Sequence, residues 1–151
     1  MLETRVVDVD LDRKKIFTST GGTVNYNRLV IALGCVVKKI QCRRKKEKPL
    51  EGIHYLRSAD EGIRIHAALT EAKNENKIVL VIGGRFVGME CLIAGVKLGL
   101  KPIFVVSKPH VMDGLLPQEV AARYEKNLTE KGVRFIRGVK VKKLVGENGK
   151  V

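Results

Sequence analysis

The sequence lacks tryptophan and holds only 4 prolines and 3 cysteines in 151 residues. The cysteines, Cys35, Cys42 and Cys91, are odd in number and widely spaced, and no Cys-x-x-Cys pair occurs. Such spacing indicates neither a zinc site nor a redox-active dithiol. We therefore interpret the three residues as reduced, unpaired thiols of an intracellular protein.

Long hydrophobic runs are also missing. No apolar stretch approaches the roughly 20 residues that a helix needs to cross a bilayer. Charged residues follow Met1 almost at once, which is unlike a secretory signal. With 44% hydrophobic and 30% charged residues, the chain is typical of a globular protein rather than a disordered one. We expect an intracellular location, with cytoplasm, plastid and mitochondrion all open.

Acidic residues are few, since 16 Asp and Glu face 29 Lys and Arg, which gives a net charge of +13. Much of the excess lies between Lys38 and Lys48, where Glu47 is the one acidic residue. Two interpretations stay open: residues 37–52 form a solvated, self-repelling linker, or residues 38–48 bind nucleic acid as a basic module. This run holds no aromatic side chain on which the bases of a single strand could stack.

Residues 77–90 carry the most informative motif. A continuous apolar run from Ile78 to Ile82 leads into a glycine turn. An apolar pattern of helical spacing then extends from Phe86 to Leu98, and Gly99 closes it. This order of strand, turn and helix predicts an α/β fold with a Rossmann-like βαβ nucleotide-binding unit and a parallel sheet.

The glycine turn departs from the dinucleotide fingerprint Gly-x-Gly-x-x-Gly at its centre. Gly83 and Gly88 occupy the first and third glycine positions, but Arg85 occupies the second. The second glycine lets the backbone approach a pyrophosphate, and a side chain there stands where the phosphate would lie. The motif is therefore a strong signal for the fold and a damaged one for dinucleotide binding.

Further strands follow from turn residues and short apolar runs. They are expected over residues 4–10, 15–18, 53–56, 101–106, 133–136 and 139–145, with turns at Gly21-Gly22 and Asn148-Gly149. Leu29 to Ala32 is a continuous apolar run of the kind that is buried in a parallel sheet. The first 36 residues therefore predict a β-rich segment that ends in one buried strand.

Two more helices have start and stop signals. Ser58 and Glu61 form a capping box at the start of a helix to about Lys73, and Pro117 starts a helix that Gly132 ends. The apolar faces are expected to carry Ile63, His66, Ala67 and Thr70 in the first helix, and Val120, Tyr124 and Leu128 in the second.

Several segments in sequence order resemble one family of flavoenzymes. Tyr26 to Gly34 is similar to the end of the flavin domain in two-dinucleotide-binding flavoproteins, although Leu33 stands where that family has threonine. Beside the glycine turn and its Met89-Glu90 pair, the matching segments are Gly52 to Arg57, Pro109 to Met112, Tyr124-Glu125 and Lys131 to Gly138. Together they resemble the monodehydroascorbate reductases, plant-type enzymes that pass electrons from NAD(P)H through FAD to the ascorbate radical.

The resemblance implies a division into domains. Residues 1–36 would be a β-rich remnant of an FAD-binding domain, residues 37–52 a basic linker, and residues 53–151 part of an NAD(P)-binding Rossmann-like domain. The glycine motif that holds the FAD pyrophosphate in this family has no counterpart in the sequence. The implied partners are monodehydroascorbate, as the electron acceptor, and the remainder of such an enzyme.

The resemblance also implies roles for single residues. Arg57, with Ser58 beside it, matches a position that contacts FAD, and Glu90 matches a catalytic carboxylate near the contact between flavin and nicotinamide. Lys108 falls where an acidic residue would bind the ribose 2′-hydroxyl of NAD, so a basic residue there could attract the 2′-phosphate of NADP. The implied contacts of the nicotinamide nucleotide are Gly83, Gly84, Arg85, Phe86, Val87, Gly88 and Lys108.

Three departures from the family pattern surround this one cofactor. Beside Arg85 and Lys108, Gly114 stands where the family tends to place a basic side chain. We therefore expect the chain alone to be inactive as an enzyme. Three interpretations stay open: part of an FAD- and NAD(P)H-dependent oxidoreductase, a degenerate fragment, or a nucleic-acid-binding module. No metal site is expected, because His54, His66 and His110 have no partner at metal or triad spacing. Met89 and Met112 are interpreted as packing residues.

Overall fold

The structure is a computed structural model that describes residues 1–40 and 50–151. The chain divides into two compact units, Met1–Cys35 and Val36–Val151. The domain limits predicted at residues 36 and 52 stay predictions. Most of the basic run from Lys38 to Lys48 lies outside the described residues, and with it the hypothesis of a nucleic-acid module.

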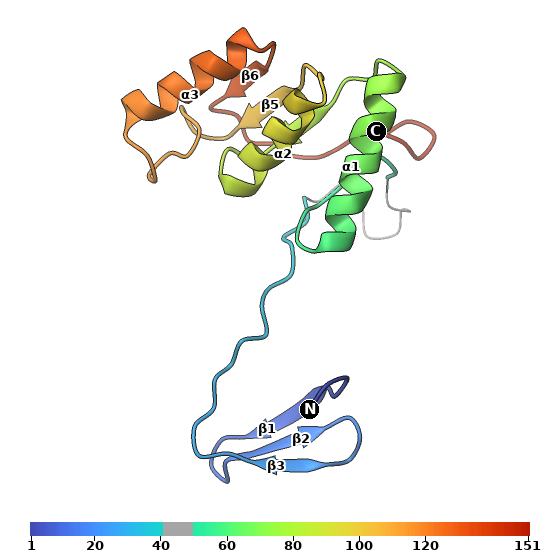
Figure 1. The fold of residues 1–151 in the computed structure, drawn as a ribbon, viewed down its shortest axis with the longest axis vertical. Helices are drawn as coiled ribbons and strands as arrows, with labels where there is room; N and C mark the ends of the chain where they lie inside the picture. The colour runs from blue at the N-terminus through green and yellow to red at the C-terminus, as the bar shows by residue number, and fades with distance from the viewer. Residues whose placement is uncertain (41–49) are drawn as a thin grey trace. The chain divides into compact units, whose positions relative to one another are not determined.

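The first unit is a three-stranded antiparallel sheet. Its strands β1 (Val6–Asp10), β2 (Lys15–Thr18) and β3 (Thr23–Asn25) pair in sequence order (Figure 1). The first two strands and the Gly21-Gly22 turn agree with the sequence prediction. Gly21 has a φ of +80°, a left-handed conformation that glycine adopts without a steric penalty. The β-rich character of this segment is therefore confirmed.

The buried strand predicted from Leu29 to Ala32 is wrong. These residues form no strand, and the side chains of Val30 and Ile31 are 86% and 70% exposed. A strand of a parallel sheet needs neighbours for its backbone N–H and C=O groups. No segment among the described residues pairs with this run, so its apolar composition alone does not make a strand.

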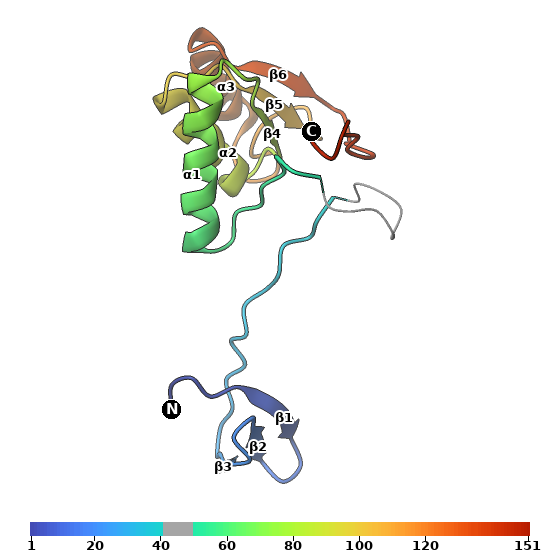
Figure 2. The same ribbon diagram turned by 90° about the vertical axis from the view of Figure 1, so that its right-hand side faces the viewer.

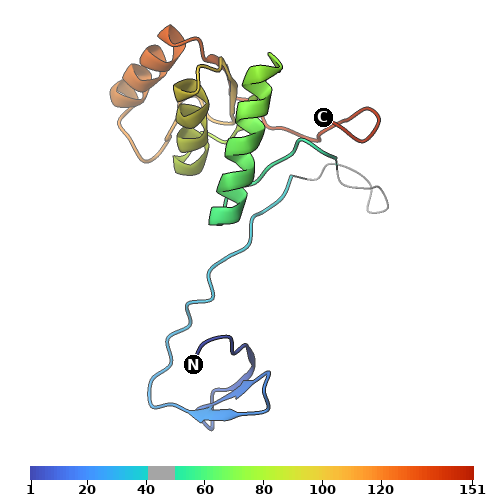
Figure 3. The ribbon, with the colours of Figure 1, turned by 45° about the vertical axis from the view of Figure 1, so that its right-hand side comes forward.

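The second unit is an α/β layer built on a parallel sheet. Its elements are α1 (Ala59–Asn74), β4 (Leu80–Ile82), α2 (Phe86–Lys97), β5 (Ile103–Val106), α3 (Gln118–Glu130) and β6 (Arg134–Arg137). The strands run in the order β4-β5-β6, with Val81 beside Phe104 and Phe104 beside Phe135. Figures 1 and 2 show the three helices on one face of this sheet, and Figure 3 shows them as a row. The predicted Rossmann-like α/β class is confirmed.

The core lies between α2, α3 and the sheet. Leu92, Phe104 and Val111 are fully buried, and Met89 and Met112 belong to the same cluster. The prediction that both methionines are packing residues is confirmed. None of the helices in the described part of the chain is long and apolar enough to cross a membrane.

The capping box of α1 forms as predicted. The Glu61 backbone N–H donates to the Ser58 hydroxyl at 3.4 Å, and the Ser58 backbone N–H donates to a Glu61 carboxylate oxygen at 2.9 Å. The Ser58 N–H is the main cause that holds the pKa of Glu61 below its ordinary value of 4.5. A lowered folded pKa means that this stabilisation is present above pH 4.5 and is lost as the pH falls through the folded value.

Ser58→Ala should therefore destabilise the second unit by about 1 kcal/mol, as loss of an N-terminal cap usually does. Urea unfolding at neutral pH measures this change. Ser107→Ala is the matched control, because Ser107 is exposed and outside any helix. Equal unfolding free energies for the two variants would contradict a capping role.

The predicted apolar faces of α1 and α3 are wrong by a rotation of the helix. Ile63 is 69% exposed, and α1 buries Leu69 and Ala72 instead. In α3, Val120 and Tyr124 are exposed and Leu128 is the one residue correctly assigned. The α3 residues that are buried are Ala121, Glu125 and Leu128. Each packed face combines a leucine with an alanine, and that of α3 adds a carboxylate, so a search for large apolar residues at helical spacing selected neighbouring positions.

Two predicted strands are absent and one predicted turn is present. Residues 53–56 and 139–145 form no strand among the described residues. Asn148 and Gly149 both have positive φ, at 51° and 81°, and Glu147 bridges Lys150 in antiparallel register. Positive φ at both central residues defines the type I′ hairpin turn that this dipeptide favours.

Candidate nucleotide site at the glycine turn

The glycine turn joins the carboxyl end of β4 to the first turn of α2. Gly83 has a φ of +119°, and a Cβ atom built on it would meet nothing within 4 Å. A Cβ on Gly88 would overlap the carbonyl oxygen of Gly83, and one on Gly84 would lie 2.5 Å from Val106 Cγ1. Close packing of helix and strand therefore requires glycine at positions 84 and 88, and Gly83 leaves an open space beside the turn.

Arg85 is accommodated without backbone strain. It is the N-cap residue of α2, with φ −106° and ψ −169°, an extended conformation that any residue adopts. Its side chain makes no cap hydrogen bond and is exposed. The first-turn N–H groups of α2 thus receive no side-chain cap from Arg85, and they carry the partial positive charge that favours a phosphate. Arg85, in place of the usual glycine, therefore adds a side chain in front of the helix and leaves the backbone of the turn without strain.

The loop of residues 107–117 follows β5 and lies against the glycine turn. The Met112 N–H donates to the Gly84 carbonyl at 2.7 Å, which places the two segments in direct contact at the carboxyl edge of the sheet. Lys108 starts this loop, and its ammonium lies 3.7 Å from the Asp113 carboxylate. Both side chains are substantially exposed, so this ion pair contributes little stability. Among the predicted site residues, the structure brings the glycine turn and the Lys108 loop together.

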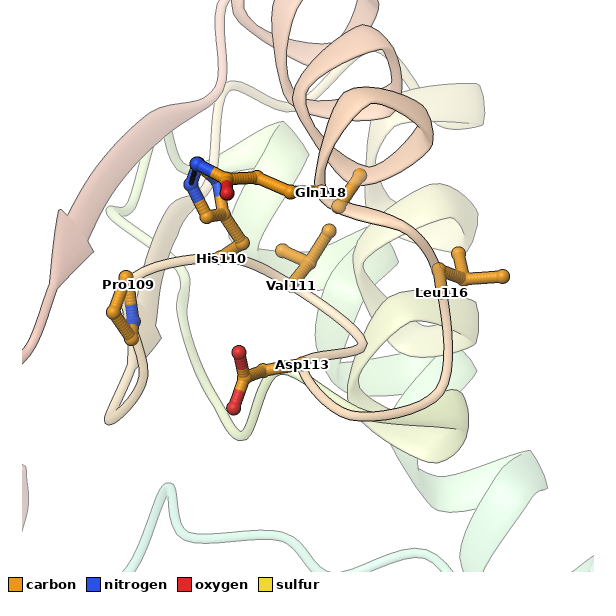
Figure 4. A pocket seen from close by; sticks show the side chains of 7 residues that line it. Pro109, His110, Val111, Asp113, Leu116 and Gln118 are labelled. Atoms are coloured by element: carbon orange, nitrogen blue, oxygen red, sulfur yellow. Dashed lines mark hydrogen bonds between the residues drawn. The ribbon is translucent and has the colours of Figure 1, made fainter.

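A small pocket opens inside the same loop. Figure 4 shows the chain from Pro109 to Gln118 curving around it, with His110 beside Gln118 and with Asp113 on the loop. The pocket has a volume of about 250 Å³. The Gln118 amide Nε2 lies 3.1 Å from His110 Nε2, and His110 Nδ1 lies 3.4 Å from Glu125 Oε2. His110 is thereby held by its neighbours, which agrees with its interpretation as a structural residue.

Glu125 is the buried charge of this region. Its side chain is 7% exposed, and Arg137 Nη2 lies 3.1 Å from Oε2. The Val111 backbone N–H donates to Oε1 at 2.8 Å, and His110 Nδ1 lies 3.4 Å from Oε2. The Arg137 guanidinium also lies 4.4 Å from the centre of the Phe135 ring. This carboxylate therefore ties α3, the loop and the end of β6 together.

Glu90 and Cys91 are neighbours on α2. Glu90 is exposed, and its predicted catalytic role stays a prediction. Burial raises the pKa of the Cys91 thiol, and the Glu90 carboxylate raises it further. Cys91 is a free cysteine that remains protonated at neutral pH, so α2 presents no thiolate nucleophile. Among the described residues no group of acidic, histidine and cysteine side chains is placed to hold a metal ion.

Ser58 and the Arg57 backbone, both assigned to FAD by resemblance, bind the Glu61 carboxylate at the start of α1. The Ser58 hydroxyl donates to the Glu61 carboxylate at 3.2 Å, so it serves the cap of α1. The Arg57 backbone N–H also donates to Glu61, at 2.9 Å. In the described part of the first unit there is no glycine turn that opens onto a helix. The assignment of Arg57 and Ser58 to FAD stays a prediction from resemblance.

Sequence reasoning gave Glu125 and its partners no role in the site, although they lie in segments that carry the family resemblance. A signal was present, because Ala121, Glu125 and Leu128 follow helical spacing and place a carboxylate on a packed face. A buried carboxylate needs hydrogen-bond donors. Those of Glu125, Val111 and Arg137, lie 12 or more residues away in sequence, and helical spacing predicts contacts only within a helix.

The comparisons with known proteins agree with this arrangement. All residues from 1 to 151 match the family model described as pyridine nucleotide-disulphide oxidoreductase. This chain belongs to the pyridine nucleotide-disulphide oxidoreductase family. The family match and the parallel sheet with its glycine turn support the same fold.

The individual relatives that this chain matches are longer than the chain. Monodehydroascorbate reductase 4 (peroxisomal) of Arabidopsis thaliana is 34% identical over 138 residues, which are 91% of this chain and 28% of that protein. Rubredoxin-NAD(+) reductase of Pseudomonas putida is 28% identical over 99% of this chain and 37% of its own length. The resemblance to monodehydroascorbate reductases is thus confirmed, and the chain spans about a third of these relatives.

A solved structure gives the same result for the fold. The ferredoxin reductase of the CYP199A2 system from Rhodopseudomonas palustris superposes with a TM-score of 0.74 at 25% identity. The match covers 98% of this chain and 35% of that protein. Because the match covers nearly the whole chain, both the antiparallel unit and the α/β unit have counterparts in this ferredoxin reductase.

Proposed function

We propose that the second unit binds a nicotinamide nucleotide as part of an FAD-dependent NAD(P)H oxidoreductase of the monodehydroascorbate reductase type. The observation that carries this proposal is the glycine turn, which is open at Gly83 and closely packed at Gly84 and Gly88. It lies at the carboxyl edge of a parallel sheet, where α/β proteins of this kind bind nucleotides. Family membership supports the same assignment.

The proposed roles follow the geometry. The turn of Gly83 to Gly88 with the first N–H groups of α2 would meet the pyrophosphate, and Lys108 would meet the adenosine ribose. FAD, when bound by the complete enzyme, would accept hydride from the nicotinamide and donate single electrons to monodehydroascorbate. Glu90 is proposed to lie near the reacting rings. Arg57 and Ser58 are proposed to contact FAD, and the other residues that would hold it belong to the remainder of the enzyme, which is the chief proposed partner of this chain.

Replacing Arg85 with glycine should tighten nucleotide binding. Glycine lets the backbone approach the pyrophosphate, and we expect a dissociation constant about tenfold lower, which corresponds to about 1.4 kcal/mol. Isothermal titration calorimetry with NAD⁺ and NADP⁺ measures the change.

Arg123→Ala is the control for this substitution, since Arg123 is an exposed cation on α3 and its loss changes the net charge equally. Weaker binding by Arg85→Gly would show that the guanidinium contacts phosphate instead of blocking it. If neither the original chain nor Arg85→Gly binds either nucleotide, the degenerate-fragment hypothesis replaces the proposed function.

A further inference from the structure

Glu125 is a charged side chain at a position that helical packing would leave to an apolar residue. It lies between Ala121 and Leu128 on the face of α3 that packs against the core, and its side chain is 7% exposed. Burying a carboxylate costs free energy unless charged and hydrogen-bonding partners compensate. Here the partners are a guanidinium, a histidine ring and a backbone N–H, and the last two belong to the loop after β5.

Three hydrogen bonds hold the first half of this loop, and each comes from a different element. The Lys108 carbonyl accepts from the Gly138 N–H at 3.2 Å, just beyond the end of β6. The Val111 N–H donates to Glu125 at 2.8 Å, and the Met112 N–H donates to the glycine turn at Gly84 at 2.7 Å. The residue before Gly138 is Arg137, so the same end of β6 is tied to Glu125 by an ion pair.

We propose that Glu125 is a positioning residue for nucleotide selection, which holds the loop so that Lys108 meets the 2′-phosphate of NADP. This inference rests on the proposed function, because it concerns the same nucleotide site. The Lys108 backbone carbonyl accepts from Gly138, while the Lys108 side chain remains 67% exposed at the edge that carries the glycine turn. Glu125 itself is buried and does not touch the ligand. It acts through the loop.

The charges that face Lys108 are consistent with this role. Asp113, on the same loop, is the acidic group whose ion pair with Lys108 the structure records, at 3.7 Å and with a side chain that is 40% exposed. An exposed pair of this kind is weak, so a phosphate dianion can compete with the carboxylate for the ammonium. We therefore expect a preference for NADP⁺ over NAD⁺ of about fivefold, the upper range for one exposed charge pair.

The decisive measurement is the ratio of the dissociation constants for NAD⁺ and NADP⁺, which differ only in the 2′-phosphate. Glu125→Gln should bring this ratio from about five to near one. The neutral amide can still accept from the Val111 N–H, but it loses the ion pair with Arg137, whose neighbour Gly138 donates to the Lys108 carbonyl. Coulomb attraction alone predicts the opposite sign, since removal of a negative charge near an anion site strengthens phosphate binding. Glu119→Gln on the same helix is the matched control, because Glu119 is exposed and its charge change is identical.

A double-mutant cycle separates positioning from a general effect on the fold. In a Lys108→Ala background the ratio should already be near one, and Glu125→Gln should change it no further. If Glu125→Gln does not fold, Arg137→Met replaces it, because it removes the same ion pair at the more exposed partner. Arg137→Met should bring the ratio near one in the original chain and should leave the ratio of Lys108→Ala unchanged.

The possible outcomes distinguish the two proposals. A chain that binds neither nucleotide overturns the proposed function and this inference together. A chain that binds both with equal affinity, or a Glu125→Gln variant that keeps the original ratio, overturns the inference and leaves the proposed function standing. A change of the ratio in the Lys108→Ala background as well would show that Glu125 does not act through Lys108.

Discussion

Gly88→Ala should destabilise the α/β unit by about 3 kcal/mol, since an added methyl group in a closely packed position forces the backbone to move. The Cβ atom would overlap the Gly83 carbonyl oxygen, which belongs to the backbone of the turn and cannot rotate away as a side chain could. Either α2 must move from β4 or the turn must open. Urea unfolding followed by circular dichroism measures the loss.

Gly95→Ala is the matched control for this prediction. Gly95 lies in the same helix, and its added Cβ would be 3.5 Å from Pro102 Cγ, an ordinary van der Waals distance. Alanine in a helix interior is favoured over glycine by roughly 0.5–1 kcal/mol. Gly95→Ala should therefore stabilise the unit or leave it unchanged. A similar loss in both variants would mean that α2 does not pack on the turn as described.

Phe104→Ala should have the second large effect, a loss of about 4 kcal/mol from the removed apolar contacts and the cavity left behind. Phe104 is fully buried at the centre of the sheet, and its ring lies 5.8 Å from that of Phe135 at an interplanar angle of 58°. Strands β4 and β6 lie on either side of β5, so few neighbouring groups can move into the cavity. The unfolding midpoint in urea should fall accordingly.

Phe86→Ala provides the comparison at an exposed site. Phe86 begins α2 and is 59% exposed, so its truncation should change the unfolding free energy by no more than about 0.5 kcal/mol. Equal effects of the two substitutions would contradict the placement of the core between α2, α3 and β5. The same pair also separates stability from binding, because Phe86 belongs to the proposed nucleotide contacts and Phe104 does not.

The predictions that succeeded rest on local chemistry. The capping box of Ser58 and Glu61, the cap at Gly99 and the hairpin turn at Asn148-Gly149 each depend on residues within a few positions of one another. The strand–turn–helix motif at Gly83 is also local in part, because Gly88 packs on the Gly83 carbonyl of the same turn, whereas Gly84 packs on Val106 of the next strand. Except for the Val106 contact, a short stretch of sequence contains the atoms that decide these features.

The predictions that failed depend on distant neighbours. Leu29 to Ala32 has the composition of a buried strand, but no described segment pairs with it. The packed faces of α1 and α3 are decided by the surface against which each helix lies, and that surface is formed by residues outside the helix. The burial of Glu125 also depends on distant residues, because its partners Val111 and Arg137 lie outside α3.

The sequence by itself determined the order of the three helices, the α/β class and the position of the glycine turn, because backbone conformation and helical spacing are properties of short segments. Only the tertiary structure decided which residues share the candidate site. In the tertiary structure the Met112 N–H donates a hydrogen bond to the Gly84 carbonyl, which places the Lys108 loop against the turn. The Val111 N–H donates to Glu125, which joins the same loop to α3. Such contacts depend on how strands and helices meet in space, and that arrangement is set by the packing of the whole unit.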